Sequence, residues 1–400
     1  MHDNSPKKIN LSELHIADEH KNIIKLAHNL CKSPFTLNNE LDIFTDGLSK
    51  FDALKQDLRN ATKSILLQYY IFLDDGIGNE IADILISKAG QGVKVKVIYD
   101  HIGSFSAKNK FFEKMEQHGV ETHPFFRVNF PHFANRINWR NHRKIVVIDG
   151  KIGYIGGMNI ADRYVNGLPN GEVWRDTHFR VKGDIVESLI YSFAVDWNFL
   201  KKHPYVPQVK AEQSDIFNLT GLQLVTGGPT ERWNNLTLCF LRAISSARKR
   251  ILIQTPYFLP TDGLLNALEA AALAKIDVRI MMPQNTDSKL LHYASFSYIT
   301  QCLKAGIKVY LYEPGMLHAK AMIIDDNFVT AGSTNFDFRS FENNFECNLL
   351  IYDSNLNRQM RDIFFNDVKK CEKLNLEHWR KRPLSQRFLE SLLRLVSPIL

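Results

Sequence analysis

One polar pattern occurs twice in this chain of 400 residues, and it constrains the fold more than any other feature. Each copy has a histidine, a lysine, an aspartate, a glycine and an asparagine at one internal spacing. The first copy is His142, Lys144, Asp149, Gly156 and Asn159, and the second is His318, Lys320, Asp325, Gly332 and Asn335. The offset between the copies is the same for every pair, from the histidines to the asparagines. The repeat predicts two similar halves, and its imidazole, ammonium and carboxamide groups suit the handling of a phosphodiester.

Strand geometry indicates which of these side chains act together. Residues two apart in a β-strand share a face, so His142 and Lys144 are expected to point the same way, as are their counterparts in the second copy. Asp149 comes an odd number of positions after His142 and has the opposite parity. We therefore expect Asp149 and Asp325 to hold the ends of their strands rather than contact substrate.

A turn after each apolar stretch sets an expected strand register. If Gly150 and Lys151 form a two-residue hairpin loop, the residue numbers of each cross-strand pair add up to 301. A loop at the corresponding place in the second copy gives pairs whose numbers add up to 653. The facing pairs expected are Asn159 with His142, Gly157 with Lys144, Asn335 with His318 and Ser333 with Lys320.

Two other interpretations compete with phosphodiester chemistry. A single histidine and lysine on one strand are usually a solvated face, but the same pair in two matching hairpins argues against this. A metal site is disfavoured because ammonium is not a ligand and the aspartate has the wrong parity to share an ion with its histidine. We therefore predict no metal and no other cofactor.

The duplicated residues resemble the signature of the phospholipase D superfamily, His-x-Lys-x4-Asp followed by Gly-x2-Asn. Longer segments are similar to bacterial cardiolipin synthases: Gly156 to Asp162, Trp174 to His178, Ser333 to Phe341 and Asn344 to Glu346. The resemblance extends from about Leu41 to the C-terminus. Many such synthases begin with two membrane-spanning helices, which are not evident in this sequence.

The resemblance implies a role for each polar residue. One imidazole forms a phosphohistidine, and the other protonates the leaving alkoxide and later deprotonates the incoming hydroxyl. We assign the nucleophile to His142 and the acid and base to His318, and the reverse assignment stays open. Donors to the nonbridging oxygens are expected from Lys144, Lys320, Asn159 and Asn335.

Other residues are expected to complete the site. The motif places Asp149 and Asp325 in the catalytic set, with Ser333 in support. The resemblance also implies carboxylates that orient the histidines: Asp176, which follows the first motif and is matched with His142, and Glu346, which follows the second and is matched with His318. A plain surface acid is the alternative for Asp176.

Further repetition predicts an α/β fold. The apolar stretches 65–72 and 251–258 read as buried strands, and each precedes a helical stretch and a second strand. Strand, helix, strand implies parallel pairing. We expect two phospholipase D-like halves with mixed, largely parallel sheets, which the resemblance packs about a pseudo-twofold axis. The expected divisions are an N-terminal arm (1–40), a first half (41–200), a linker (201–220), a second half (221–375) and an amphipathic tail (376–400).

Composition points to an anionic partner. The formal charge is +7 and the isoelectric point is near 9.0, which suits either anionic lipid or nucleic acid. The resemblance favours phosphatidylglycerol at a membrane surface and no nucleic acid. Five scattered cysteines predict free thiols in a reducing compartment. No apolar run approaches the ~18 residues of a spanning helix, so at a bacterial cell membrane the protein is either peripheral or lacks an N-terminal anchor in this sequence.

Two segments bear on lipid contact. Residues 124–143 interleave aromatics with arginines and read either as a stacking or interfacial segment or as a loop packed on the sheet. At the C-terminus a basic run, 380–382, precedes an apolar stripe over 388–399. This stripe predicts an interfacial helix, with a helix docked on the core as the alternative.

The function that these observations favour is cardiolipin synthesis, in which a phosphatidyl group moves between two phosphatidylglycerol molecules and glycerol is released. The alternatives are a phospholipase D that transfers the group to water, and a nuclease that uses the same core. A non-catalytic membrane tether is a further alternative, but a binding module needs neither paired imidazoles nor their orienting acids.

Overall fold

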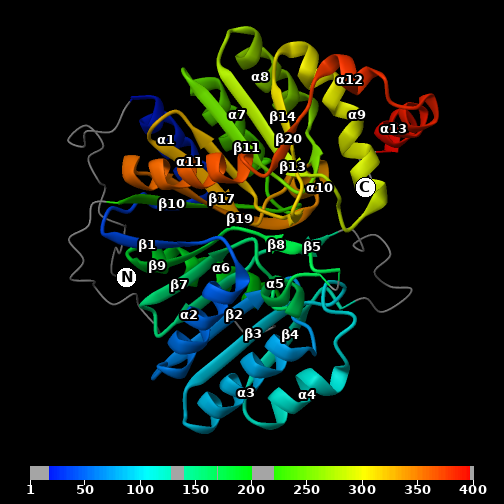
Figure 1. The fold of residues 1–400 in the computed structure, drawn as a ribbon. Helices are drawn as coiled ribbons and strands as arrows, with labels where there is room; N and C mark the ends of the chain where they lie inside the picture. Colours follow the sequence, from blue (N-terminus) through cyan, green and yellow to red (C-terminus); the bar gives the residue numbers. More distant parts are fainter. Residues whose placement is uncertain (1–17, 128–138, 169, 201–219, 397–400) are drawn as a thin grey trace.

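The computed structural model describes residues 18–127, 139–168, 170–200 and 220–396, and it contains two large sheets with helices on their faces (Figure 1). The first has the strand order β1 (Asn39–Phe44), β9 (His178–Gly183), β7 (Ile152–Gly156), β6 (Ile145–Ile148), β2 (Ser64–Tyr69), β3 (Lys94–Asp100) and β4 (Glu121–Phe125). The second has the order β10 (Gly221–Gly227), β19 (Asn344–Tyr352), β17 (Phe328–Gly332), β16 (Ala321–Ile324), β11 (Arg250–Gln254), β13 (Asp277–Pro283), β14 (Lys308–Tyr312) and β20 (Cys371–Lys373). The expected linker, 201–220, lies outside the described residues except for Thr220, as do residues 1–17 of the expected arm.

The helices follow the strands in the same order in both halves. The first set is α2 (Gly47–Arg59), α3 (Gly76–Gly90), α4 (Asn109–Gln117), α5 (Asp162–Asn166) and α6 (Ile185–Leu200). The second set is α7 (Asn235–Ser246), α8 (Asp262–Leu273), α9 (Lys289–Ala305), α10 (Phe338–Glu342) and α11 (Ser354–Val368). The remaining helices are α1 (Asp18–Cys31), which packs on α7 and β10, and α12 (Leu376–Arg380) and α13 (Leu384–Val396) at the C-terminal end.

The expectation of largely parallel sheets is wrong, although both sheets are mixed. Within the two strand orders given above, β2–β3–β4 and β11–β13–β14 pair in parallel, and these are the strands that helices connect. The other neighbours in each order are antiparallel. Short hairpins join β6 to β7 and β16 to β17, and a hairpin permits only antiparallel pairing.

The expected hairpin register is wrong by one residue. Ile145 faces Ile155 and Ala321 faces Ala331, so facing numbers sum to 300 and 652. The loop has three residues because Asp149 itself takes up a left-handed conformation, with φ 54°, and Asp325 does the same with φ 50°. Since β6 and β16 begin after the lysines, the histidines and lysines precede the strands instead of lying in them.

The core joins the two halves. One buried apolar cluster contains Phe179 and Leu189 from the first half together with Leu224 and Leu349 from the second. Phe125 is buried there against Phe345, with ring centroids 5.2 Å apart, which supports the packed-loop alternative for this residue. Most of the expected aromatic segment, 128–138, lies outside the described residues.

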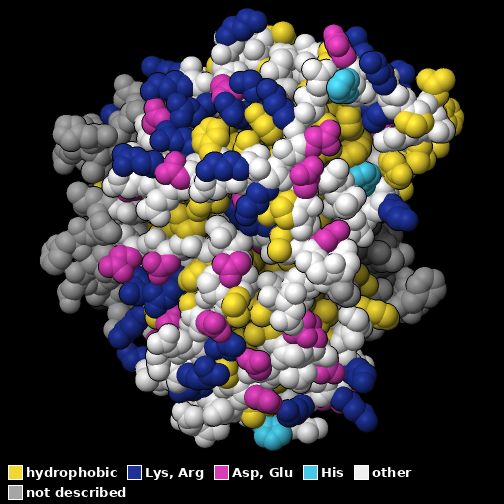
Figure 2. All heavy atoms as spheres, in the orientation of Figure 1, with side chains coloured by type: hydrophobic (Ala, Val, Ile, Leu, Met, Phe, Trp, Pro, Cys, Tyr) yellow, Lys and Arg dark blue, Asp and Glu magenta, His cyan; other side chains and the backbone are white. Residues whose placement is uncertain are grey.

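Helix α13 is both docked and exposed. Leu393 is buried, and Arg394 Nη2 donates to Gln301 Oε1 of α9 over 2.8 Å. The opposite side exposes Leu384, Phe388, Leu392 and Leu395, which are 50–79% accessible, and apolar side chains gather over α13 in Figure 2. Within the described ranges no helix has the length and apolar character to cross a membrane.

Candidate active site

Each half of the chain lends a short strand to the other. β5 (Arg140–Asn141) pairs in parallel with β19, and β15 (Gly315–Leu317) pairs in parallel with β8 (Val173–Arg175). The exchange continues one residue further, because His142 N donates to Phe345 O over 2.9 Å and His318 N donates to Arg175 O over 2.7 Å. The backbone of each histidine is therefore held next to the other half's acidic residue.

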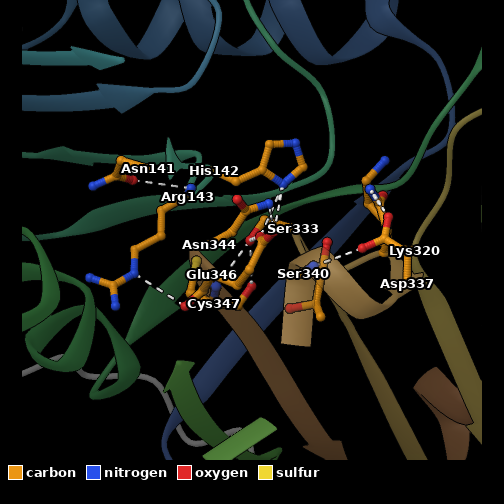
Figure 3. A network of polar contacts seen from close by, with 12 residues as sticks. Asn141, His142, Arg143, Lys320, Ser333, Asp337, Ser340, Asn344, Glu346 and Cys347 are labelled. Atoms are coloured by element: carbon orange, nitrogen blue, oxygen red, sulfur yellow. Dashed lines mark hydrogen bonds and ion pairs between the residues drawn. The ribbon is translucent and has the colours of Figure 1, made fainter. Parts of the chain in front are cut away.

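The carboxylates pair with the histidines across the halves. Glu346 Oε1 and Oε2 lie 2.9 and 3.0 Å from His142 Nδ1 (Figure 3), and Asp176 Oδ2 lies 2.7 Å from His318 Nδ1. The expectation that Asp176 serves His142 and Glu346 serves His318 is wrong, because the strand exchange places each acid beside the distant histidine. In both rings Nδ1 is held, which leaves Nε2 available to a substrate.

Glu346 is itself held by neighbours. Ser333 Oγ donates to Glu346 Oε2, and Asn344 Nδ2 donates to Oε1 over 3.2 Å. Although burial favours the neutral acid, attraction to the protonated forms of His142 and Lys144 and hydrogen bonds from His142 and Ser333 keep the pKa of Glu346 below its usual value. The predicted position of Ser333 opposite Lys320 is wrong, since Gly332 N bonds Lys320 O instead. Ser333 supports the carboxylate that orients His142.

Both lysines are buried beside the histidines. Lys144 Nζ donates to His142 O over 2.5 Å, and Lys320 Nζ donates to His318 O. Burial lowers the pKa of Lys144 to about 7 and that of Lys320 to about 8, although Glu346 and Asp176 oppose the shift in both. The pair supplies positive charge that an entering anion would stabilise.

Burial also lowers the pKa of both histidines to about 4. In each case the partner carboxylate raises the pKa and the neighbouring lysine lowers it. Both imidazoles are therefore neutral at pH 7 before a phosphate binds, which is the form that a nucleophile requires.

Asn159 and Asn335 line a cavity between the two halves, which His142 and His318 also line. They do not face the histidines across the hairpins, as the expected register had placed them. Asn159 Oδ1 accepts from Ile71 N over 3.1 Å, and its Nδ2 donates to the Tyr164 hydroxyl over 2.7 Å. Asn335 Nδ2 donates to Asp337 Oδ2 over 3.0 Å, while its buried Oδ1 has no hydrogen-bond partner among the described residues. These bonds fix the asparagines in the cavity wall.

The aspartates of the repeat stand outside the cavity. Asp149 accepts from the backbone N–H groups of residues 62–64 over 2.7–2.9 Å, and Asp325 accepts from those of residues 248–250 over the same range. Their position gives no support to their inclusion in the catalytic set, and the expectation that they hold strand ends is confirmed. Each ties a hairpin to the start of the adjacent strand.

The cavity between the halves has a volume of about 200 Å³. It brings together His142, His318, Asn159 and Asn335 of the repeat. The lining residues that the sequence analysis did not assign to the site include Tyr70, Arg163, Tyr257, Asp287 and Arg339. Arg163 and Arg339 are related by the same offset as the two histidines, so extending the repeat beyond the asparagines could have found them.

Comparisons with known proteins agree with this architecture. A family profile described as "Cardiolipin synthase, PLD-like domain" matches residues 54–191 and 240–368. Cardiolipin synthase 2 of Bacillus cereus is 42% identical over 382 residues, which are 94% of this chain and 74% of that protein. The major cardiolipin synthase of Bacillus subtilis is 41% identical over 369 residues, which are 92% of this chain and 76% of that protein.

A solved structure shares the fold at low sequence identity. The phosphatidylserine synthase of Haemophilus influenzae superposes with a TM-score of 0.71 at 16% identity. The match covers 95% of this chain and all of that one.

Proposed function

We propose that this chain, which belongs to the cardiolipin synthase family of the phospholipase D superfamily, transfers a phosphatidyl group from one phosphatidylglycerol molecule to the headgroup hydroxyl of another. The observation that carries the proposal is the crossed pairing of His142 with Glu346 and of His318 with Asp176 at one cavity. Two oriented imidazoles facing one phosphate can divide a displacement into two steps.

In the first step His142 Nε2 attacks the phosphorus of the donor lipid. The P–O bond to glycerol breaks as the N–P bond forms, and the leaving oxygen takes a proton from His318. Entry of the phosphodiester anion raises the pKa values of His318 and of both lysines, so the acid is charged when it is needed. Lys144 and Lys320 stabilise the charge that develops on the nonbridging oxygens.

In the second step the acceptor hydroxyl replaces the departed glycerol. Its proton passes to His318, its oxygen bonds phosphorus, and the N–P bond to His142 breaks. Cardiolipin leaves and the free imidazole is restored. The reverse assignment of the two histidines has the same balance.

Helix α13 is proposed as the contact with the membrane. Its exposed apolar side carries Phe388 and three leucines, and exposed Arg387 and Lys381 adjoin it. An apolar helix face bordered by cations suits an anionic bilayer surface.

Product analysis tests the function directly. With phosphatidylglycerol vesicles as the only lipid, mass spectrometry should find cardiolipin and free glycerol in equal amounts, with little phosphatidic acid. Phosphatidic acid as the main product would establish hydrolysis instead. Cleavage of single-stranded DNA at a comparable rate would favour the nuclease.

A further inference from the structure

The cavity is asymmetric in its carboxylates. Asp287 and Asp337 are the acidic residues that line it within the described part of the chain. Asp337 Oδ1 accepts from Ser340 N over 2.7 Å and its Oδ2 accepts from Asn335, so both of its oxygens are engaged. Asp287 is exposed at the cavity wall, and its Oδ1 accepts from the Tyr257 hydroxyl. Within the described ranges the second oxygen of Asp287 accepts no hydrogen bond, so it is left for a ligand.

An insertion in the second half places Asp287 there. Ser104 Oγ accepts from Phe72 N, and Ser295 Oγ accepts from Phe258 N, both over 3.0 Å. The two serines therefore occupy equivalent positions in the two halves. Ser104 closely follows the end of β3 at Asp100, whereas a much longer stretch separates Ser295 from the end of β13 at Pro283. Asp287 lies in the added length, so the first half offers no counterpart to it.

Arg163 lies on the same side of the cavity as His318. Its guanidinium carbon is 5.1 Å from the centroid of the Trp174 ring, which is 5.3 Å from the His318 ring. Arg163 Nε is buried without a hydrogen-bond partner, and none of the described carboxylates forms an ion pair with this guanidinium. An arginine without a carboxylate partner in a cavity wall is suited to a phosphate. Its repeat counterpart, Arg339, lines the cavity as well.

We infer that Asp287, Tyr257 and Arg163 form the subsite that selects the acceptor alcohol. Asp287 and Tyr257 bind the hydroxyl of the headgroup glycerol that does not react, and Arg163 binds the phosphodiester of the acceptor lipid. This inference rests on the proposed function and names its acceptor: a vicinal diol that carries its own phosphate.

The two parts of the subsite act on different acceptors. Free glycerol, the acceptor in the reverse reaction from cardiolipin, has the diol but no phosphate, so it uses Asp287 and Tyr257 without Arg163. Phosphatidylglycerol uses both parts, and water uses neither. The subsite favours lipid over water because it holds the correct hydroxyl near phosphorus at a high effective concentration.

The group transfer balances without a further reactant. The acceptor O–H proton moves to His318 Nε2, the new P–O bond forms, and the bond between phosphorus and His142 Nε2 breaks. The subsite residues exchange no proton and form no covalent bond. They are positioning residues for the alcohol.

The test compares product ratios among variants on phosphatidylglycerol vesicles. Arg163→Gln should lower the ratio of cardiolipin to phosphatidic acid on the order of tenfold, because a charge-assisted bond to the acceptor phosphate is lost, while consumption of donor falls less. Arg163→Lys should keep most of the ratio. Asp83→Asn and Arg59→Gln, on the distant helices α3 and α2, are the matched controls and should leave it unchanged.

A second assay supplies cardiolipin vesicles with equal concentrations of glycerol and 1-propanol. Asp287→Asn should lower the preference for glycerol on the order of tenfold, because an amide accepts more weakly than a carboxylate. Arg163→Gln should leave this preference unchanged. An unaltered product ratio in Arg163→Gln, or an unaltered glycerol preference in Asp287→Asn, would overturn the subsite. Failure of the wild type to form cardiolipin would instead overturn the proposed function.

Discussion

Glu346 of the second half orients His142 of the first, with both carboxylate oxygens within 3.0 Å of the imidazole Nδ1. Asp176 of the first half does the same for His318 of the second. Neither half therefore contains a complete histidine–carboxylate pair, and the predictions below depend on that interlocking.

Removal of either imidazole should abolish turnover. Because both histidines serve one phosphate, His142→Ala and His318→Ala should each reduce phosphatidyl transfer to background, and the double variant should be little worse. Initial rates of cardiolipin formation measure this. Two single variants with half of the wild-type rate would indicate independent sites.

Loss of an orienting carboxylate should reduce rate more than stability. Glu346→Gln keeps the size of the side chain but cannot stabilise the charged imidazole, so kcat should fall by roughly 100-fold or more. Glu342→Gln, in the nearby helix α10, is the control and should retain the wild-type rate. An equal loss in both variants would assign the effect to local distortion.

The aspartates of the repeat should affect stability. Asp149→Ala removes the acceptor for three backbone N–H groups and for the Thr62 hydroxyl. Loss of these bonds should cost about 2–4 kcal/mol of unfolding free energy. Thermal unfolding should show a lower midpoint, while the folded fraction turns over normally. A normal midpoint with lost activity would return Asp149 to the catalytic set.

The activity should fall at alkaline pH because the two lysines lose their charge. Their pKa values of about 7 and 8 before phosphate binds mean that Lys144 and Lys320 are charged below these values and become neutral above them. The attraction for a phosphodiester is therefore lost as pH rises, and kcat/KM should fall across about pH 7–8. The limb for kcat should lie at higher pH, because bound phosphate favours the charged lysines.

Lys144→Arg provides the check on this pH dependence. Arginine stays protonated throughout the range, so the alkaline limb of kcat/KM should shift upward even if the maximal rate falls. A limb unchanged in both Lys144→Arg and Lys320→Arg would assign the titration to another group.

Membrane attachment should depend on the exposed side of α13. Truncation after Pro383 should release the protein from anionic vesicles, but it also uncovers the part of α9 beneath Leu393. Phe388→Glu and Leu395→Glu leave the docked side intact, and each should weaken vesicle binding by roughly tenfold or more in cosedimentation. Ser391→Glu, at an exposed polar position of the same helix, is the control for added charge. Undiminished binding of both apolar-face variants would contradict the assignment.

The sequence predicted the chemistry of the site better than its pairing. The duplicated motif identified His142 and His318, which share one cavity. The partners of these histidines could not be predicted, because the strand exchange depends on tertiary packing that spacing along the chain does not encode. The left-handed conformation of Asp149 moved the register by one residue, which a two-residue loop rule could not anticipate. Arg163 and Arg339 could have been found because they are related by the offset of the repeat. Asp287 could not, because it lies in an insertion that has no counterpart in the first half.

The exchanged strands also make activity depend on a finished chain. During synthesis the first half emerges with His142 but without Glu346, so its imidazole lacks the acid that presents the correct nitrogen. A chain that ends before His318 contains neither complete histidine–carboxylate pair, so we expect it to turn over no phosphodiester. The pair formed by His142 and Glu346 is complete only when β19 of the second half lies beside β5 of the first.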